Sequence, residues 1–296
     1  MARRKPAITH GLCVVDKPAG ITSHDVVGLL RKRFHERQVG HAGTLDPDAT
    51  GVLVVAVGMS TKLLRFVEKT TKRYGGEVVL GTETSTLDAA GDVTATYDMS
   101  GVSLEQARRV VAEHLLGEIE QIPPMVSAIR IDGRRLHELA REGIEVERQP
   151  RPVTIHSFTV DDGRQPGVFS IEVECSAGTY IRTLAADLGT LLGGGAHLRN
   201  LRRAAVGEFG IDEAGSPDAC ELQPVETTVR GLERVDIDAA TACLVGNGRV
   251  LRRFAGVVGA GPWAVFGPND VLLAVYEDFG SDQAKPSVVL PTAIDR

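Results

Sequence analysis

An unbroken run of apolar and glycine residues at 51–58, GVLVVAVG, comes directly after the glycine-rich loop GHAGTLDPDATG at 40–51. Eight such residues are too few for most helices, so we predict a buried β-strand there. The loop must then lie at the rim of the fold, where its glycines let the backbone come close to a ligand. Asp-Pro alone is ordinary turn chemistry, but this loop also places Asp46 and Asp48 beside a buried strand.

Composition indicates a soluble protein with one large domain and a small one. Of its 296 residues, 43% are apolar and 24% charged, and its glycines and prolines are scattered. No stretch approaches the roughly 18–20 apolar residues of a membrane helix, and the N-terminus lacks the apolar segment of a secretory signal. The four cysteines form no C-x-x-C pair, which fits reduced structural thiols. We therefore expect a cytoplasmic protein without membrane contact.

The net charge of −6 hides an asymmetry along the chain. Residues 1–75 hold 13 basic against 6 acidic side chains, whereas residues 211–296 hold 7 against 13. The basic segment can form an anion-binding face, although a solvated charged surface is about as common. Charge alone therefore leaves both readings open.

Periodicity predicts strands alternating with helices over the first two thirds of the chain. Ser23 is the expected N-cap of a helix that continues through Phe34, and Ser103 with Gln106 predicts a capping box before a helix over 103–117. The alternation at 169–175 predicts a half-buried strand, and a helix follows over 180–192. Other predicted elements are strands at 11–15 and from 73, a short helix at 61–69, and strands at 263–266, 271–278 and 287–290.

Four motifs in one order carry a resemblance to a known family. They are DKPAGITSHDVV at 16–27, GHAGTLDPDATG at 40–51, KRY at 72–74 and CSAGTYIRTLAADLG at 175–189. Over residues 11–210 the chain closely resembles bacterial tRNA pseudouridine synthases of the TruB type. Four separate motifs in register are hard to produce by chance.

The resemblance implies the pseudouridine synthase fold. This fold is α+β, with a mixed, mainly antiparallel, bent sheet and flanking helices. We expect the catalytic domain over residues 1–216, with an RNA-closing thumb insertion at about 123–152. Residues 217–296 would form a linker and a small β-rich, PUA-like RNA-binding module, to which the resemblance is weaker.

The resemblance also implies catalytic residues. Asp46 matches the family's catalytic aspartate, and Arg182 matches the arginine that pairs with it. A guanidinium beside a buried carboxylate keeps it ionised and holds its orientation. Tyr74 matches the tyrosine that stacks on the extruded base and has been proposed to take part in proton transfer.

Further residues are candidates for substrate binding. His41 matches a histidine thought to help displace the target nucleotide, although it could equally be a hydrogen-bonding fixture of the loop. Asp88 matches an aspartate near the active site, with an Asx turn as the competing reading. The other candidates are Tyr180, Leu198, Arg202 and, in the thumb, Arg130, which stands where many relatives have lysine.

The implied reaction converts uridine 55 in the T loop of tRNA to pseudouridine, by base flipping and an aspartate-dependent glycosidic rearrangement. Because the atoms are conserved, we expect no cofactor and no metal. The T arm of tRNA is the expected partner, and the protein is expected to be a monomer. Alternatives are a non-catalytic tRNA-binding chaperone and a related synthase acting on another RNA.

Overall fold

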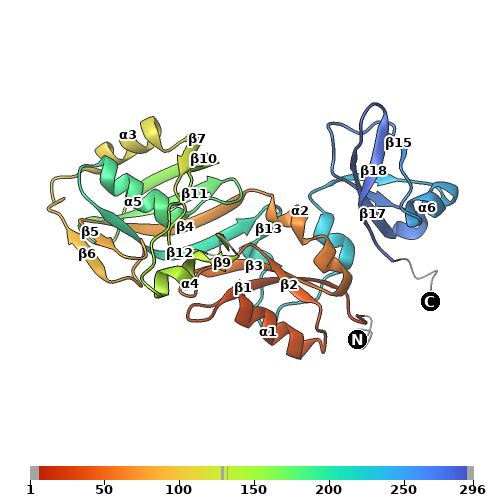
Figure 1. Cartoon of the computed structure of the whole chain (residues 1–296), viewed down its shortest axis with the longest axis horizontal. Helices are drawn as coiled ribbons and strands as arrows, with labels where there is room; N and C mark the ends of the chain where they lie inside the picture. Colours follow the sequence, from red (N-terminus) through yellow and green to blue (C-terminus); the bar gives the residue numbers. More distant parts are fainter. Residues whose placement is uncertain (1–6, 128–129, 132, 292–296) are drawn as a thin grey trace.

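The computed structural model of the chain describes residues 7–127, 130–131 and 133–291, and for residues 130, 131, 135, 137 and 141 it describes the backbone alone. In this part of the chain, nine strands form one sheet with the order β1-β3-β12-β4-β11-β10-β7, to which β2 and β13 are added (Figure 1). All pairings in it are antiparallel except the short one between β3 and β12. The predicted mixed, mainly antiparallel α+β fold is confirmed.

The strands of the large sheet are β1 (Gly11–Lys17), β2 (Val39–Ala42), β3 (Thr50–Val57), β4 (Lys72–Leu80), β7 (Gly117–Gln121), β10 (Arg151–Asp162), β11 (Val168–Cys175), β12 (Ala196–Val206) and β13 (Phe209–Gly210). Two hairpins lie outside it, β5 (Thr82–Thr84) with β6 (Val93–Thr96) and β8 (Arg130–Ile131) with β9 (Arg134–Arg135). The helices before residue 217 are α1 (Ser23–Arg33), α2 (Leu64–Glu68), α3 (Leu104–His114), α4 (Leu136–Arg141) and α5 (Ile181–Leu191).

Strand β3 is covered on both faces, which explains its lack of alternation. Val52 and Val54 pack with residues of β1, α2 and β13, whereas Leu53 and Val55 pack with α1. A strand buried on both sides reads as a continuous apolar run. Residues 43–49, called the catalytic loop because they carry the proposed catalytic Asp46, therefore lead into a rigid strand.

The helix starts show one correct prediction and one error. Ser103 and Gln106 form the predicted capping box of α3. The N-cap of α1, however, is Thr22, whose side chain accepts a hydrogen bond from the backbone N–H of Asp25 while the Asp25 carboxylate accepts from the backbone of Thr22. Ser23 is instead the first helical residue, because its buried hydroxyl is used by another segment.

Strand β12 was not expected, since the arginines of HLRNLRRAAV look like a surface cluster. It lies between β3 and β4 and brings these two strands into one sheet. The approach to β3 is so close that a Cβ on Gly51 would lie 2.2 Å from the carbonyl oxygen of Arg203. Glycine at position 51, with φ of +101°, is therefore required by this contact.

A five-stranded sheet, β14-β16-β17-β18-β15, follows near the C-terminus, with α6 (Ala239–Gly246) packed on it (Figure 1). Its apolar residues at 263–266 and 272–275 join Leu63 and Val229 of the preceding part in one buried cluster. The predicted β-rich module is confirmed, while its PUA likeness and the boundary at 216/217 stay predictions. Its strands are β14 (Glu233–Asp236), β15 (Leu251–Arg252), β16 (Trp263–Phe266), β17 (Leu272–Asp278) and β18 (Gln283–Val289).

Candidate active site

The catalytic loop is fixed by hydrogen bonds on both sides of Asp46. The buried Ser23 hydroxyl donates to the carbonyl of Leu45 at 3.0 Å and accepts from its N–H at 2.8 Å. On the other side, the ammonium of Lys17 donates to the carbonyl of Pro47 at 2.8 Å. Lys17 is 0% exposed and also donates to two carbonyls of its own turn. These contacts hold the peptide on either side of the aspartate.

The carboxylate of Asp46 meets the guanidinium of Arg182 near the start of α5. Arg182 Nε lies 3.0 Å from Oδ2 of Asp46, and Nη2 lies 3.3 Å from Oδ1. The same guanidinium donates to the carbonyls of Thr86 and Val126, each at 2.8 Å. Arg182 is 4% exposed, so its orientation is set by these four contacts. The predicted pair is therefore in direct contact.

Asp88 approaches Arg182 from the turn after β5. Its Oδ2 lies 3.6 Å from Arg182 Nε, while its Oδ1 accepts from the Thr86 hydroxyl at 2.5 Å and from the Ala90 N–H at 3.1 Å. Both readings of Asp88 from the sequence thus describe the same side chain. Its turn geometry is what places the second carboxylate beside the arginine.

The electrostatic balance at Asp46 differs from the simple expectation for an ion pair. Burial raises the pKa of Asp46, and the nearby charge of Asp88 adds to the rise. Arg182 and Lys17 oppose this effect without cancelling it. The carboxylate is therefore oriented by a cation but remains more basic than an ordinary surface aspartate.

Two small cavities share Asp46, Arg182 and Leu201 as lining residues. One, of about 270 Å³, is also lined by Tyr74 and Tyr180. The other, of about 240 Å³, adds two more residues that the sequence singled out, Asp88 and Leu198. The structure thus brings six of the nine candidate residues to one place, namely Asp46, Tyr74, Asp88, Tyr180, Arg182 and Leu198.

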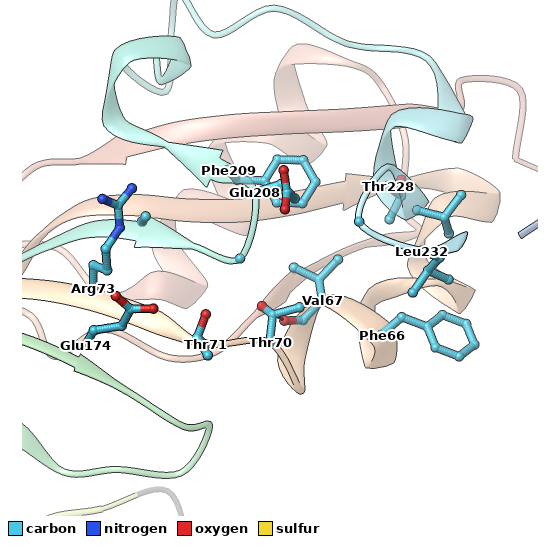
Figure 2. A pocket seen from close by; sticks show the side chains of 14 residues that line it. Phe66, Val67, Thr70, Thr71, Arg73, Glu174, Glu208, Phe209, Thr228 and Leu232 are labelled. Carbon is cyan, nitrogen blue, oxygen red and sulfur yellow. Dashed lines mark hydrogen bonds between the residues drawn. The ribbon is translucent and has the colours of Figure 1, made fainter. Parts of the chain in front are cut away.

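A larger hollow of about 630 Å³ opens elsewhere, where β4 begins and β12 ends (Figure 2). Arg73 and Glu174, which pair across β4 and β11, line it together with residues 228, 229, 231 and 232. Arg73 lines this hollow whereas the next residue, Tyr74, lines the cavity of Asp46, as the alternation of a strand requires. This larger hollow is therefore separate from the candidate site.

Two candidate residues are not brought to these cavities, and the side chain of a third is outside the described part of the chain. Among the described residues, His41 on β2 and Arg202 on β12 line neither of them. Burial lowers the pKa of the His41 imidazole, with a further contribution from Arg203. Arg202 is bound to Asp16 by two contacts of 2.8 and 3.1 Å. The side chain of Arg130 lies outside the described part of the chain.

Sequence reasoning missed three residues of this site: Ser23, Leu201 and Arg203. Ser23 was assigned to a helix cap, although Thr22 with Asp25 gives the better capping box. Leu201 lies three positions from the chosen Leu198 and lines both cavities. Arg203 is only 1% exposed, and the sequence does not tell which of Arg199, Arg202 and Arg203 is buried.

Residues 7–127, 130–131 and 133–291 contain no group of three His, Cys, Asp or Glu side chains placed to hold a metal ion. Nor does any helix in this part of the chain have the length and apolar character to cross a membrane.

Comparison with known proteins identifies the class to which this fold and site belong. Residues 31–181 match the model of the TruB family pseudouridylate synthase N-terminal domain, and residues 182–235 match the tRNA pseudouridylate synthase B C-terminal domain. A solved chain from a Cbf5-Nop10-Gar1 complex has a TM-score of 0.72 and 25% identity, covering 95% of this chain and 85% of that one. An H/ACA RNP bound to a substrate RNA shares the fold, with a TM-score of 0.71.

Curated relatives extend the match to nearly the whole chain. The tRNA pseudouridine synthase B of Mycobacterium sp. (strain KMS) is 46% identical over 96% of this chain and 97% of its own. The proteins of that name from Rhodococcus jostii and Streptomyces coelicolor are 43% and 46% identical, covering 99% and 90% of this chain and 99% and 93% of their own. The chain belongs to the TruB family of pseudouridine synthases.

Proposed function

We propose that this protein isomerises uridine to pseudouridine in tRNA, at the T-loop position conventionally numbered 55. The observation that carries the proposal is the contact between Asp46 and Arg182 in a cavity that Tyr74 also lines. The shared name of relatives that match nearly the whole chain supports tRNA as the substrate. A tRNA substrate also supports a cytoplasmic location, and we expect the protein to act as a monomer.

The reaction rearranges bonds without adding or removing atoms. The bond between N1 of uracil and C1′ of the ribose breaks, the uracil turns, and a bond from C5 to C1′ forms. The proton on C5 is lost and N1 gains one, so no outside electron or group donor is consumed. The protein must supply an anionic group, a dry pocket and a way to hold the detached base.

Asp46 is the proposed catalytic group, and its raised pKa fits a carboxylate that acts as nucleophile or base. Attack on C1′, attack on C6 and assisted elimination all need its ionised form. Arg182 holds the carboxylate in one direction while its other donors are occupied by backbone carbonyls. A fixed carboxylate beside a small cavity favours a sugar or base that has been turned out of the RNA stack.

The remaining candidates would bind the flipped nucleotide and its surroundings. Tyr74 offers a ring on which the base can stack. Asp88, Tyr180 and Leu198 line the same pair of cavities. His41 would occupy the space that the uridine leaves, and Arg130 and Arg202 would contact phosphates of the T arm. These three roles rest on the family resemblance.

The test is Asp46→Asn, which keeps the shape of the side chain and removes its charge. Pseudouridine formed in unmodified tRNA should be measured with enzyme in excess, and its position mapped. We expect turnover to cease while tRNA binding persists, because phosphate contacts supply most of the affinity. In the parent protein the rate should fall at acidic pH, as Asp46 becomes protonated, at a higher pH than an ordinary aspartate would give.

Asp162→Asn is the control, because it removes one negative charge at an exposed position of β10 that lines neither cavity. A folded Asp46→Asn protein that reacts within about tenfold of the parent, a barrier change of about 1.4 kcal/mol, would contradict the assignment. A parent protein that binds tRNA without forming pseudouridine would support the chaperone alternative. Product in another RNA but not in tRNA would support the related synthase.

A further inference from the structure

Arg203 is a buried cation to which the preceding proposal gives no role. It lies on β12 and is 1% exposed. Its Nε donates to the carbonyl of Val52 at 2.7 Å, and its Nη2 donates to the carbonyl of Gly43 at 3.0 Å. A buried guanidinium is costly unless its donors are paired, so these contacts fix its position. Arg203 thereby ties the start of the catalytic loop to β3.

The same side chain faces Tyr74. Arg203 and Tyr74 are partners across the antiparallel pair of β12 and β4, and both line the cavity of Asp46. Directly opposed residues of an antiparallel pair have Cβ atoms about 4.5–5.5 Å apart on one face, so the long guanidinium side chain can reach the phenol. A guanidinium has five N–H donors and only two are used by the carbonyls of Val52 and Gly43, so a donor is left for the phenol oxygen.

The charges around the phenol have opposing effects. Burial raises the pKa of Tyr74, the Arg203 guanidinium lowers it, and Cys175 and Asp46 raise it. Lys72 lies two residues away on β4, and burial together with Arg203 lowers its pKa to about 8. The other charged or titratable groups that line this cavity are Glu68, Tyr180 and Arg182. Arg203 is thus the cation directly opposite Tyr74 in the register of β12 and β4.

We propose that Arg203 is a positioning residue that acts through Tyr74: its guanidinium donates to the hydroxyl oxygen and directs the O–H toward the cavity. The inference rests on the proposed function of this site. It gives the Tyr74 hydroxyl a part in the chemistry beyond stacking of the ring. It also explains why an arginine, with several donors in a fixed plane, occupies a position where lysine could reach fewer acceptors.

The first test measures the phenol directly and needs no turnover. With 3-fluorotyrosine at position 74, fluorine NMR across a pH series gives the midpoint of its ionisation. We expect Arg203→Gln, which keeps donors but removes the charge, to raise this midpoint by at least about half a pH unit. Arg202→Gln, at the neighbouring exposed position, should leave it unchanged. An unchanged midpoint in a folded Arg203→Gln protein would overturn the proposal.

The second test is a double-mutant cycle in single-turnover kinetics with Arg203→Lys and Tyr74→Phe. We expect Arg203→Lys to slow the saturated rate by at least about tenfold, with tRNA affinity nearly unchanged, and to slow Tyr74→Phe far less. Arg108→Lys, on the surface of α3, controls for the substitution itself. An equal loss with and without the Tyr74 hydroxyl would assign Arg203 to the loop alone and overturn the proposal. If the parent forms no pseudouridine, the proposed function fails, while the phenol titration still decides the role of Arg203.

Discussion

The arginines beside the Asp46 cavity and those of the five-stranded sheet are held in opposite ways. Arg182 on α5 and Arg203 on β12 are 4% and 1% exposed, and each donates to backbone carbonyls. In the five-stranded sheet, Arg234 and Arg252 pair with aspartates at the surface, and the Arg252 side chain is 85% exposed. Buried guanidinium groups are fixed by many partners, whereas exposed pairs are screened and mobile.

The buried core of the five-stranded sheet contains an aromatic cluster. The five-stranded sheet is built around Trp263 and Tyr276, both 0% exposed, with the ring of Phe254 packed edge-on against them. Its stability comes from this aromatic cluster rather than from its ion pairs. Burial of a charge is costly, and beside the Asp46 cavity buried guanidinium groups hold other groups in a fixed orientation. In the five-stranded sheet the arginines instead form ion pairs at the surface.

The sharpest test of the comparison is the substitution by lysine of Arg182 and, separately, of Arg234. Arg182→Lys leaves the charge but cannot hold two carbonyls and a carboxylate together, so we expect the saturated rate to fall about 100- to 1000-fold. Arg234→Lys should leave the rate unchanged. Single-turnover assays, after melting curves confirm folding, measure both. Similar rates for the two variants would remove the distinction between the buried and the exposed arginines.

A smaller effect is expected for Asp88→Asn. Because the charge of Asp88 raises the pKa of Asp46, its removal should lower that pKa. The active, ionised form of Asp46 then persists to lower pH, so the acidic limb of the rate profile should move to lower pH. The plateau should also fall by roughly tenfold, since the substrate contact proposed for Asp88 is lost. An acidic limb that stays in place would show that Asp46 does not control it.

Removal of residues from 231 onward asks whether the second sheet contributes to chemistry. Every proposed catalytic group lies before it, so we expect a severalfold rise in KM with little change in kcat. The melting temperature should drop, because Leu63 and Val229, 0% and 3% exposed, lose the apolar residues that cover them. A folded, tRNA-saturated truncation with a greatly reduced kcat would show that the module helps to build the active site.

The smallest effect is expected for Arg234→Ala. Its partners Asp236 and Asp270 are largely exposed, so the pair is weakened by solvent and salt. We expect no measurable change in melting temperature or in pseudouridine formation. A clear loss of stability would mean that surface ion pairs, and not the aromatic cluster alone, hold the five-stranded sheet together.

The sequence by itself determined the elements with strong local signals. The apolar run at β3, the alternation at β11 and the capping box of α3 could all be predicted, because each depends on neighbours within a few residues. The motif around Asp46, with Tyr74 and Arg182 in matching motifs, led to the family and to the candidate site. These features need no knowledge of which strands are adjacent.

Only the tertiary structure decided which charges are buried. Lys17 and Ser23 look like turn and cap residues until the catalytic loop is placed against them. Arg203 looks like its neighbour Arg202 until β12 inserts between β3 and β4, where its guanidinium meets two carbonyls and its backbone lies opposite Tyr74. The physical reason is that burial of a cation depends on acceptors supplied by distant segments, and no local pattern in the sequence records them.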